Sequence, residues 1–196
     1  IGRRFSNFVT NTKANYVSSL YKKEQKHKRQ NMNYKDYIGT FQKAAGKLDK
    51  NVLQKRQVEV AVGEVLNSVF LKLYKKSWTN PFQDPLTADT RIFFSIWLND
   101  AAINNQKIFY NIHALKLRHL KGYSIQSRKF ANTFRESFKN YAHEWQNISM
   151  NFGPLTLMEG WHKIDLENFQ SDIVNLSNSF LKIEHLIEDT LFEFKH

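Results

Sequence analysis

The amino-acid sequence predicts an all-α fold, an antiparallel bundle of four to five long helices with two short helices. Three observations lead to this prediction. The 196 residues include only 3 prolines and 7 glycines, and so few helix breakers favour long helices over many short strands. Apolar residues recur at three- and four-residue spacings in several long segments. The prolines fall in two stretches, at 78–86 and 151–154, which read as loops between helices.

The N-terminal part of the chain is predicted to form three helices. The first spans about 3–30 and ends in a run of basic residues, and a shorter one follows at 34–45. The third begins at Asn51, a favourable N-cap residue, and extends to about residue 76. Valines at 58–62 favour a strand there, but the apolar 4-3-4-4 spacing that continues beyond them favours a helix.

The C-terminal part is predicted to form four more helices. The first spans about 87–110, or continues to 120, and the second spans 124–149 with an aromatic ridge that reads as core. A capping box at 156–159 opens a short helix. The last helix, 166–194, repeats apolar residues as heptads, the pattern of a coiled coil. This heptad face is expected to pack inside the bundle or on a partner, including a second copy of the chain.

The charge is strongly positive and unevenly distributed. The chain carries 29 Lys and Arg against 18 Asp and Glu, a net charge of +11. Residues 1–80 contribute +12, whereas residues 152–196 contribute −5. A basic surface favours an anionic partner such as nucleic acid or an anionic membrane. The chain has 21 Lys against 8 Arg, and it has 19 Asn. An AT-rich genome produces the same excess of Lys and Asn.

Two groups of cations are the candidate anion-binding residues. One group ends the first helix and the other forms a face of the helix at 124–149, where each side chain would make an electrostatic contact. The candidates are Lys22, Lys23, Lys26, Lys28, Arg29, Arg128, Arg135 and Lys139.

A second interpretation is an all-α enzyme or small-ligand sensor. Polar residues form a stripe along the predicted helix at 87–110, and histidines nearby could act as general acids or bases. The site would lie between the fourth and fifth helices. Its candidate residues are Trp97, Asn104, His113, His119 and His143.

Several kinds of chemistry find no support in the sequence. Because the chain has no cysteine, thiol nucleophiles, disulfides, iron–sulfur clusters and Cys-ligated zinc are excluded. Neither a glycine-rich phosphate loop nor a known nucleophile motif occurs. The pairs Glu24/His27 and Glu159/His162 have di-iron spacing but not a core context. We therefore predict no catalytic residue, metal or cofactor, and favour a binding protein over an enzyme without deciding between them.

These observations predict one helical-bundle domain over 1–196, with 78–86 as a candidate internal boundary. The first residue is Ile1, so the chain is expected to be a piece of a longer protein. No window approaches 18 apolar residues, which favours an intracellular, cytoplasmic protein. The leading hypothesis is a non-enzymatic helical interaction protein whose basic N-terminal half contacts nucleic acid or an anionic membrane. A third interpretation is the soluble domain of a membrane-anchored protein whose anchor precedes residue 1.

Overall fold

The computed structural model describes residues 33–165 and 167–196. The basic run at 22–29 lies outside these residues. Residues 34–196 form one compact unit, and the loop at 78–86 lies within it. Within the described ranges, no helix combines the length and the apolar character needed to cross a bilayer.

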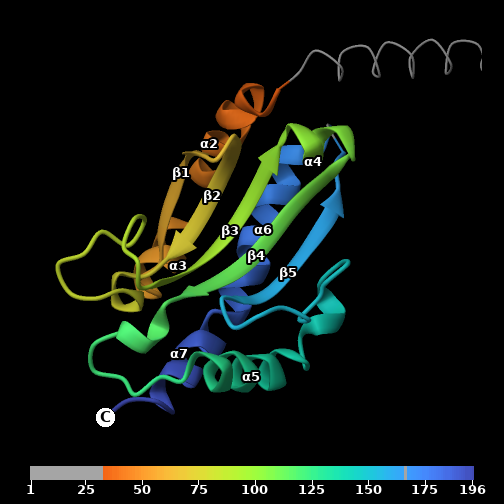
Figure 1. Cartoon of the computed structure of the whole chain (residues 1–196). Helices are drawn as coiled ribbons and strands as arrows, with labels where there is room; N and C mark the ends of the chain where they lie inside the picture. Colours follow the sequence, from red (N-terminus) through yellow and green to blue (C-terminus); the bar gives the residue numbers. More distant parts are fainter. Residues whose placement is uncertain (1–32, 166) are drawn as a thin grey trace, which may run out of the picture. The chain divides into compact units, whose positions relative to one another are not determined.

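The predicted all-α bundle is wrong, because the centre of the fold is a five-stranded antiparallel sheet (Figure 1). Each strand pairs with the next strand along the chain, in the order β1-β2-β3-β4-β5. The strands are β1 (Glu59–Val65), β2 (Ser68–Tyr74), β3 (Arg91–Asn99), β4 (Lys107–Leu115) and β5 (Thr156–Lys163).

Helices precede, interrupt and follow the sheet. The α-helices are α2 (Ile38–Gly46), α3 (Lys50–Lys55), α4 (Asp100–Asn104), α5 (Ser127–Phe138), α6 (Phe169–Ile183) and α7 (His185–Phe192). Short 3₁₀ turns are η1 (Tyr34–Tyr37), η2 (Lys76–Trp78), η3 (Leu117–His119) and η4 (Ala142–Glu144).

The segment predicted as one helix from 51 to 76 folds into α3 and the hairpin of β1 and β2. Along β2, Val69, Leu71 and Leu73 are fully buried on one face, which is the two-residue period of a strand. Leu66 and Asn67 form the hairpin turn with φ values of 48° and 57°. A tight two-residue hairpin turn of type I′ requires two consecutive residues with positive φ. A right-handed helix cannot continue through two such residues.

The segment predicted as a helix at 87–110 likewise folds into β3, α4 and β4. Ile92, Phe94 and Ile96 alternate along β3 on its buried face. The Asn99 side chain accepts a hydrogen bond from the Ala102 N–H at 2.8 Å, which caps the short helix α4 between the two strands. The site predicted between the fourth and fifth helices therefore does not exist in that form.

The C-terminal heptad pattern is not a coiled coil. The helix is interrupted at Glu184 between α6 and α7. Its apolar face is buried within the chain, where Phe180 of α6 stacks on Phe94 of β3 with ring centroids 4.5 Å apart. Phe169 at the start of α6 contacts Phe41 of α2 edge to face at 5.9 Å.

The helices α2 and α6 cover one face of the sheet, and α6 runs behind the strands in Figure 1. The helix α5 packs against α7 and β5 through Phe130, Phe134 and Phe138, which are fully buried as the sequence predicted. Among the described residues, no helix lies over the opposite face of the sheet, which is turned toward the viewer in Figure 1. We call this the uncovered face.

Candidate functional site

Aromatic side chains form a row across the uncovered face. The register of the strands places Phe70 of β2 opposite Trp97 of β3, Trp97 opposite Phe109 of β4, and Phe109 opposite Trp161 of β5. The rings of Trp97 and Phe109 are stacked, with centroids 4.7 Å apart and planes 13° apart. We call these four residues the aromatic row. All four are partly exposed, so their rings remain accessible to a ligand.

A polar row lies beside the aromatic row, two residues along each strand. It consists of Lys72, Ser95, Asn111 and Glu159, which are paired from strand to strand in the same way. Lys72, Ser95 and Asn111 are only 9%, 5% and 3% exposed, although no described helix covers them.

A groove of about 480 Å³ lies over the polar row, and Phe70 and Trp97 are the residues of the aromatic row that line it. The polar row forms part of its lining, together with Phe70 and Trp97 on one side and Phe93 and His113 on the other. Polar groups among apolar walls, in a hollow of this size, are typical of a binding site for a small or planar ligand.

Two residues that line this groove each have a buried polar atom without a hydrogen-bond partner. Asn111 Oδ1 and Arg91 Nε are buried and unsatisfied in the part of the chain that the structure describes. The third such atom, Glu184 Oε2, lies elsewhere and forms an ion pair with Lys75 Nζ at 2.8 Å. A buried polar group without a partner costs about 1–3 kcal/mol.

Lys72 is the buried cation of the groove. Its Nζ lies 4.4 Å from the ring centroid of Phe70 and 4.6 Å from that of Phe93. No described carboxylate lies within ion-pair distance of it. Burial, with a smaller contribution from the charge of Arg91, lowers the pKa of Lys72. An anionic group in the groove would therefore supply the counter-charge that the described protein does not.

His113 adds an imidazole ring to the lining of the groove. Its Nδ1 lies 3.2 Å from the carbonyl oxygen of Leu155 and 3.2 Å from the hydroxyl oxygen of Thr156. Burial lowers the pKa of His113, which favours the neutral ring.

Two further lysines meet at the end of the aromatic row. Lys107 of β4 and Lys163 of β5 are directly opposed in the sheet. Lys107 Nζ lies 3.8 Å from the Trp161 ring centroid, and neither lysine forms an ion pair with any described residue. These cations and the aromatic row therefore share one surface.

The five predicted pocket residues are only partly brought together. Trp97 and His113 line the groove. Asn104 ends α4, His119 ends η3 and His143 lies in η4, and all three are exposed. None of these three lines the groove.

The predicted cations of α5 and its C-cap residue Lys139 have different surroundings from one another. The Arg135 guanidinium donates hydrogen bonds to the carbonyl oxygens of Phe152, Gly153, Thr156 and Leu157 at 2.8–3.0 Å. Arg135 therefore holds the loop before β5. Its neighbours Arg128 and Lys139 are exposed, and Lys139 pairs with Glu136 at 2.8 Å.

Sequence reasoning missed most of the groove. Lys72 and Arg91 were not predicted as site residues, because their segments were interpreted as helices. Asn111 was considered only as part of the polar stripe of the helix at 87–110, and Glu159 only as a metal-ligand pair with His162. A signal was present in β3 and β4, where Phe93, Ser95 and Trp97 alternate with apolar residues, as do Phe109, Asn111 and His113. This period of two points to strands with one face carrying aromatic and polar side chains.

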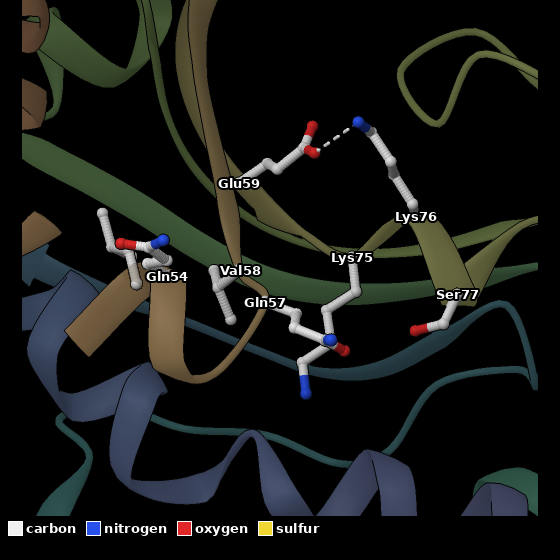
Figure 2. A pocket seen from close by; sticks show the side chains of 8 residues that line it. Gln54, Gln57, Val58, Glu59, Lys75, Lys76 and Ser77 are labelled. Carbon is white, nitrogen blue, oxygen red and sulfur yellow. Dashed lines mark ion pairs between the residues drawn. The ribbon is translucent and has the colours of Figure 1, made fainter. Parts of the chain in front are cut away.

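A second hollow, of about 410 Å³, lies beside α3 (Figure 2). Lys76 and Glu59 both line this pocket, and Lys76 Nζ forms an ion pair with Glu59 Oε1 at 3.1 Å, drawn as the dashed line in Figure 2. Lys75 pairs with Glu184 and Glu188, each at 2.8 Å. Burial alone would lower the pKa of Lys75, but these two carboxylates together raise it. The lysines here already have counter-charges, so the groove on the uncovered face is the stronger candidate site.

No protein-family model, curated protein or solved structure matches this chain. In the described part of the chain, no cluster of three or more His, Asp or Glu side chains is arranged to hold a metal ion.

Proposed function

We propose that this chain is a binding protein that holds single-stranded nucleic acid across the uncovered face of its sheet. The observation that carries this proposal is the presence, on one face, of the aromatic row and of three lysines without described carboxylate partners. Single-stranded nucleic acid offers bases that stack on aromatic rings and phosphates that bind cations. Both kinds of group are accessible once the strand is unpaired.

The dimensions of the face suit a short stretch of a strand. The aromatic row crosses four neighbouring strands, which at 4.7–4.9 Å between strands corresponds to about 14 Å. Stacking contributes about 1–3 kcal/mol for each base. Lys107 and Lys163 at one margin and Lys72 in the groove would then contact the phosphates on either side of the stacked bases.

The overall charge favours the same partner. The net charge of +11 raises the affinity for any polyanion, and the basic run at 22–29 would add contacts of this kind. This long-range attraction carries no sequence information, because phosphate contacts are the same for every base.

A second candidate function is the binding of a small planar anion, such as a mononucleotide. The size of the groove favours it, and so do Lys72 and Arg91, two cationic residues in its lining. Its binding would depend on the groove alone and would not increase with the length of an oligonucleotide.

The test is a titration of the full chain with fluorescent 15-mers of single-stranded DNA and RNA at two salt concentrations. A double-stranded 15-mer, a mononucleotide and phosphatidylcholine vesicles containing phosphatidylglycerol are measured in parallel. We expect tighter binding to the single strands than to the duplex, with an affinity that falls as salt rises. Trp97→Leu and Trp161→Leu should each weaken this binding about tenfold, the loss of one stacked base.

The matched control is Phe192→Leu, which removes an aromatic ring that is 77% exposed on α7, away from the sheet. This variant should bind like the wild type. The proposal is overturned if single strands do not bind at low salt, or if the vesicles bind and the single strands do not. Equal losses from Trp97→Leu and Phe192→Leu would also overturn it.

A further inference from the structure

We infer that two copies of this chain pair through the outer edge of β1, so that their sheets join into one continuous antiparallel sheet. The observation behind this inference is a difference between the two edge strands of the sheet, β1 and β5. An edge strand whose backbone groups have no partner is a template for pairing with another chain. The inference goes beyond the proposed function and does not depend on it.

The outer edge of β5 is already occupied. Ser149 and Glu159 exchange two backbone hydrogen bonds, of 2.8 and 3.0 Å. The carbonyl oxygens of Leu157 and Trp161, on either side of Glu159, each accept a hydrogen bond from a side chain at 3.0 Å. A further strand would have to displace these bonds, so this edge does not recruit one.

The outer edge of β1 is open. The hairpin turn makes Val65 and Ser68 a hydrogen-bonded pair, and hydrogen-bonded and non-bonded pairs alternate along an antiparallel ladder. The N–H and C=O groups of Val60, Val62 and Glu64 therefore point away from β2. No described backbone group pairs with them.

The usual protections of an edge strand are also missing from β1. Its sequence contains neither proline nor lysine, and its pairing with β2 has no bulge. Val60 and Val62 pack against the core but remain partly exposed. A neighbouring strand would complete their burial.

A second copy fits this edge in one antiparallel register. When Val62 lies opposite Val62 of the second copy, Val60 lies opposite Glu64, and every outward N–H and C=O group of these three residues gains a partner. The same register sets Glu59 opposite Val65, so no carboxylate faces another directly. Like charges in opposed positions, which destabilise a sheet, are thereby avoided.

This register also brings an exposed leucine to a hollow. Leu66 at the hairpin tip is 91% exposed, and its φ of 48° is a conformation that asparagine and glycine adopt more readily. In the pairing, Leu66 comes alongside Val58 of the second copy. Val58 and Leu53 line the hollow of about 410 Å³ beside α3, where Figure 2 labels Val58. Each copy thus offers one exposed leucine and one hollow, the self-complementary arrangement of a two-fold dimer.

The pairing stops at two copies, because the edge that each copy contributes is then used and the edge of β5 is occupied. Residues opposed across paired strands lie on the same face. The uncovered faces of the two copies would therefore form one surface.

The experiment is sedimentation equilibrium of the full chain across the micromolar concentration range. We expect a monomer–dimer equilibrium whose upper mass is twice the 23.2 kDa of the chain. Leu66→Asn should weaken the dimer about tenfold or more, because two buried leucines are lost, while asparagine suits the positive φ and keeps the hairpin. The matched control is Leu155→Asn, 48% exposed beside β5, which should dimerise like the wild type. Circular dichroism checks that both variants keep the fold.

A single cysteine tests the register. The chain has no cysteine, so Val62→Cys can form a disulfide only with another copy. In a hydrogen-bonded antiparallel pair the Cα atoms lie about 5.5 Å apart, within the range of a disulfide. Val62→Cys should therefore give a covalent dimer on mild oxidation. Val60→Cys is the matched control, because its two copies would lie about 14 Å apart along the strands.

The inference is overturned if the chain stays monomeric at every concentration, or if it forms an assembly larger than a dimer. A dimer that tolerates Leu66→Asn as well as it tolerates Leu155→Asn uses another surface, which also overturns it. Equal rates of oxidation of Val62→Cys and Val60→Cys would contradict the pairing centred on Val62.

Discussion

Lys107 and Lys163 occupy directly opposed positions on β4 and β5, so two positive side chains meet at the end of the aromatic row. Like charges in such a pair repel each other and destabilise the sheet. Neither lysine has an ion-pair partner within residues 33–165 and 167–196. A bound phosphate would relieve this repulsion, which links the arrangement to the proposed function.

Replacing either lysine should have opposite effects on binding and on stability. For Lys107→Gln or Lys163→Gln, we expect weaker single-strand binding and a slope of log K against log salt that is shallower by about 0.7 for each lost phosphate contact. The free energy of unfolding should rise by about 0.2–1 kcal/mol, because the repulsion is removed. Titrations at several salt concentrations and urea unfolding measure the two effects.

The control for this pair is Lys182→Gln, a lysine on α6 whose side chain is 69% exposed. It should leave the salt slope unchanged. If Lys182→Gln lowers the slope as much as Lys107→Gln does, the phosphates do not bind preferentially at the aromatic row.

Arg135 should prove to be a structural residue. Its guanidinium donates to four carbonyl oxygens of the segment before and within β5, and Arg135→Met would leave several of them without a partner. We expect the free energy of unfolding to fall by about 2–4 kcal/mol, since each such charged hydrogen bond contributes about 1.5–3 kcal/mol and the contributions overlap. Urea unfolding of the variant measures this loss.

The exposed Arg128 on the same helix is the matched position, and Arg128→Met should change stability by less than about 0.5 kcal/mol. A fully stable Arg135→Met variant with weakened nucleic-acid binding would show instead that Arg135 contacts the ligand.

Gly160 should not tolerate a side chain. It lies opposite Tyr110 in the sheet, and a Cβ atom at this position would overlap the Tyr110 hydroxyl group. That hydroxyl donates to the carbonyl oxygen of Gln146, so the ring cannot move away without losing this bond. Gly160→Ala should therefore lower the free energy of unfolding by about 1–3 kcal/mol, as measured by thermal or urea unfolding.

Gly39 in α2 offers the comparison, because nothing lies within 4 Å of a Cβ atom placed there. Gly39→Ala should be neutral or stabilise the protein by up to about 1 kcal/mol. Equal effects of the two substitutions would contradict the close approach of Tyr110 to Gly160.

The protein should lose stability as the pH falls from 7 toward 5. Burial lowers the pKa values of His113 and His162 in the folded chain, whereas both titrate near the ordinary value of about 6.5 when unfolded. Between the lowered and the ordinary pKa, the unfolded state binds more protons, so stability rises with pH across this window. The two histidines therefore do not reduce the free energy of unfolding above the ordinary pKa. Below it they reduce this free energy progressively as the pH falls.

Urea unfolding at pH 7.5 and pH 5.5 tests this expectation. His113→Gln and His162→Gln should each reduce the difference in unfolding free energy between the two pH values. His143→Gln, at an exposed position of η4, should leave the difference as it is in the wild type. A wild type whose stability does not change between these pH values would contradict the prediction.

Some features of this protein follow from local sequence. The helix expected at 34–45 is present as η1 and α2. The predicted loop at 78–86 is present except for Trp78, which ends η2, and 151–154 is a loop, because proline and small polar residues disfavour regular structure. The aromatic ridge of α5 is buried because its spacing places it on one side of the helix. The exclusion of cysteine chemistry depends on composition alone.

The sheet could not be predicted in the same way. Between 58 and 73, valines and leucines fit both the two-residue period of a strand and the three- and four-residue spacing of a helix. Pairing with a distant strand decided between them, and α6 covers one face of that sheet. The same pairing places Lys72 and Glu159 in one polar row, although they are far apart in the chain. Composition and local periodicity thus account for loops, caps and the buried ridge, whereas the groove exists only because long-range strand register gathers its side chains on one face.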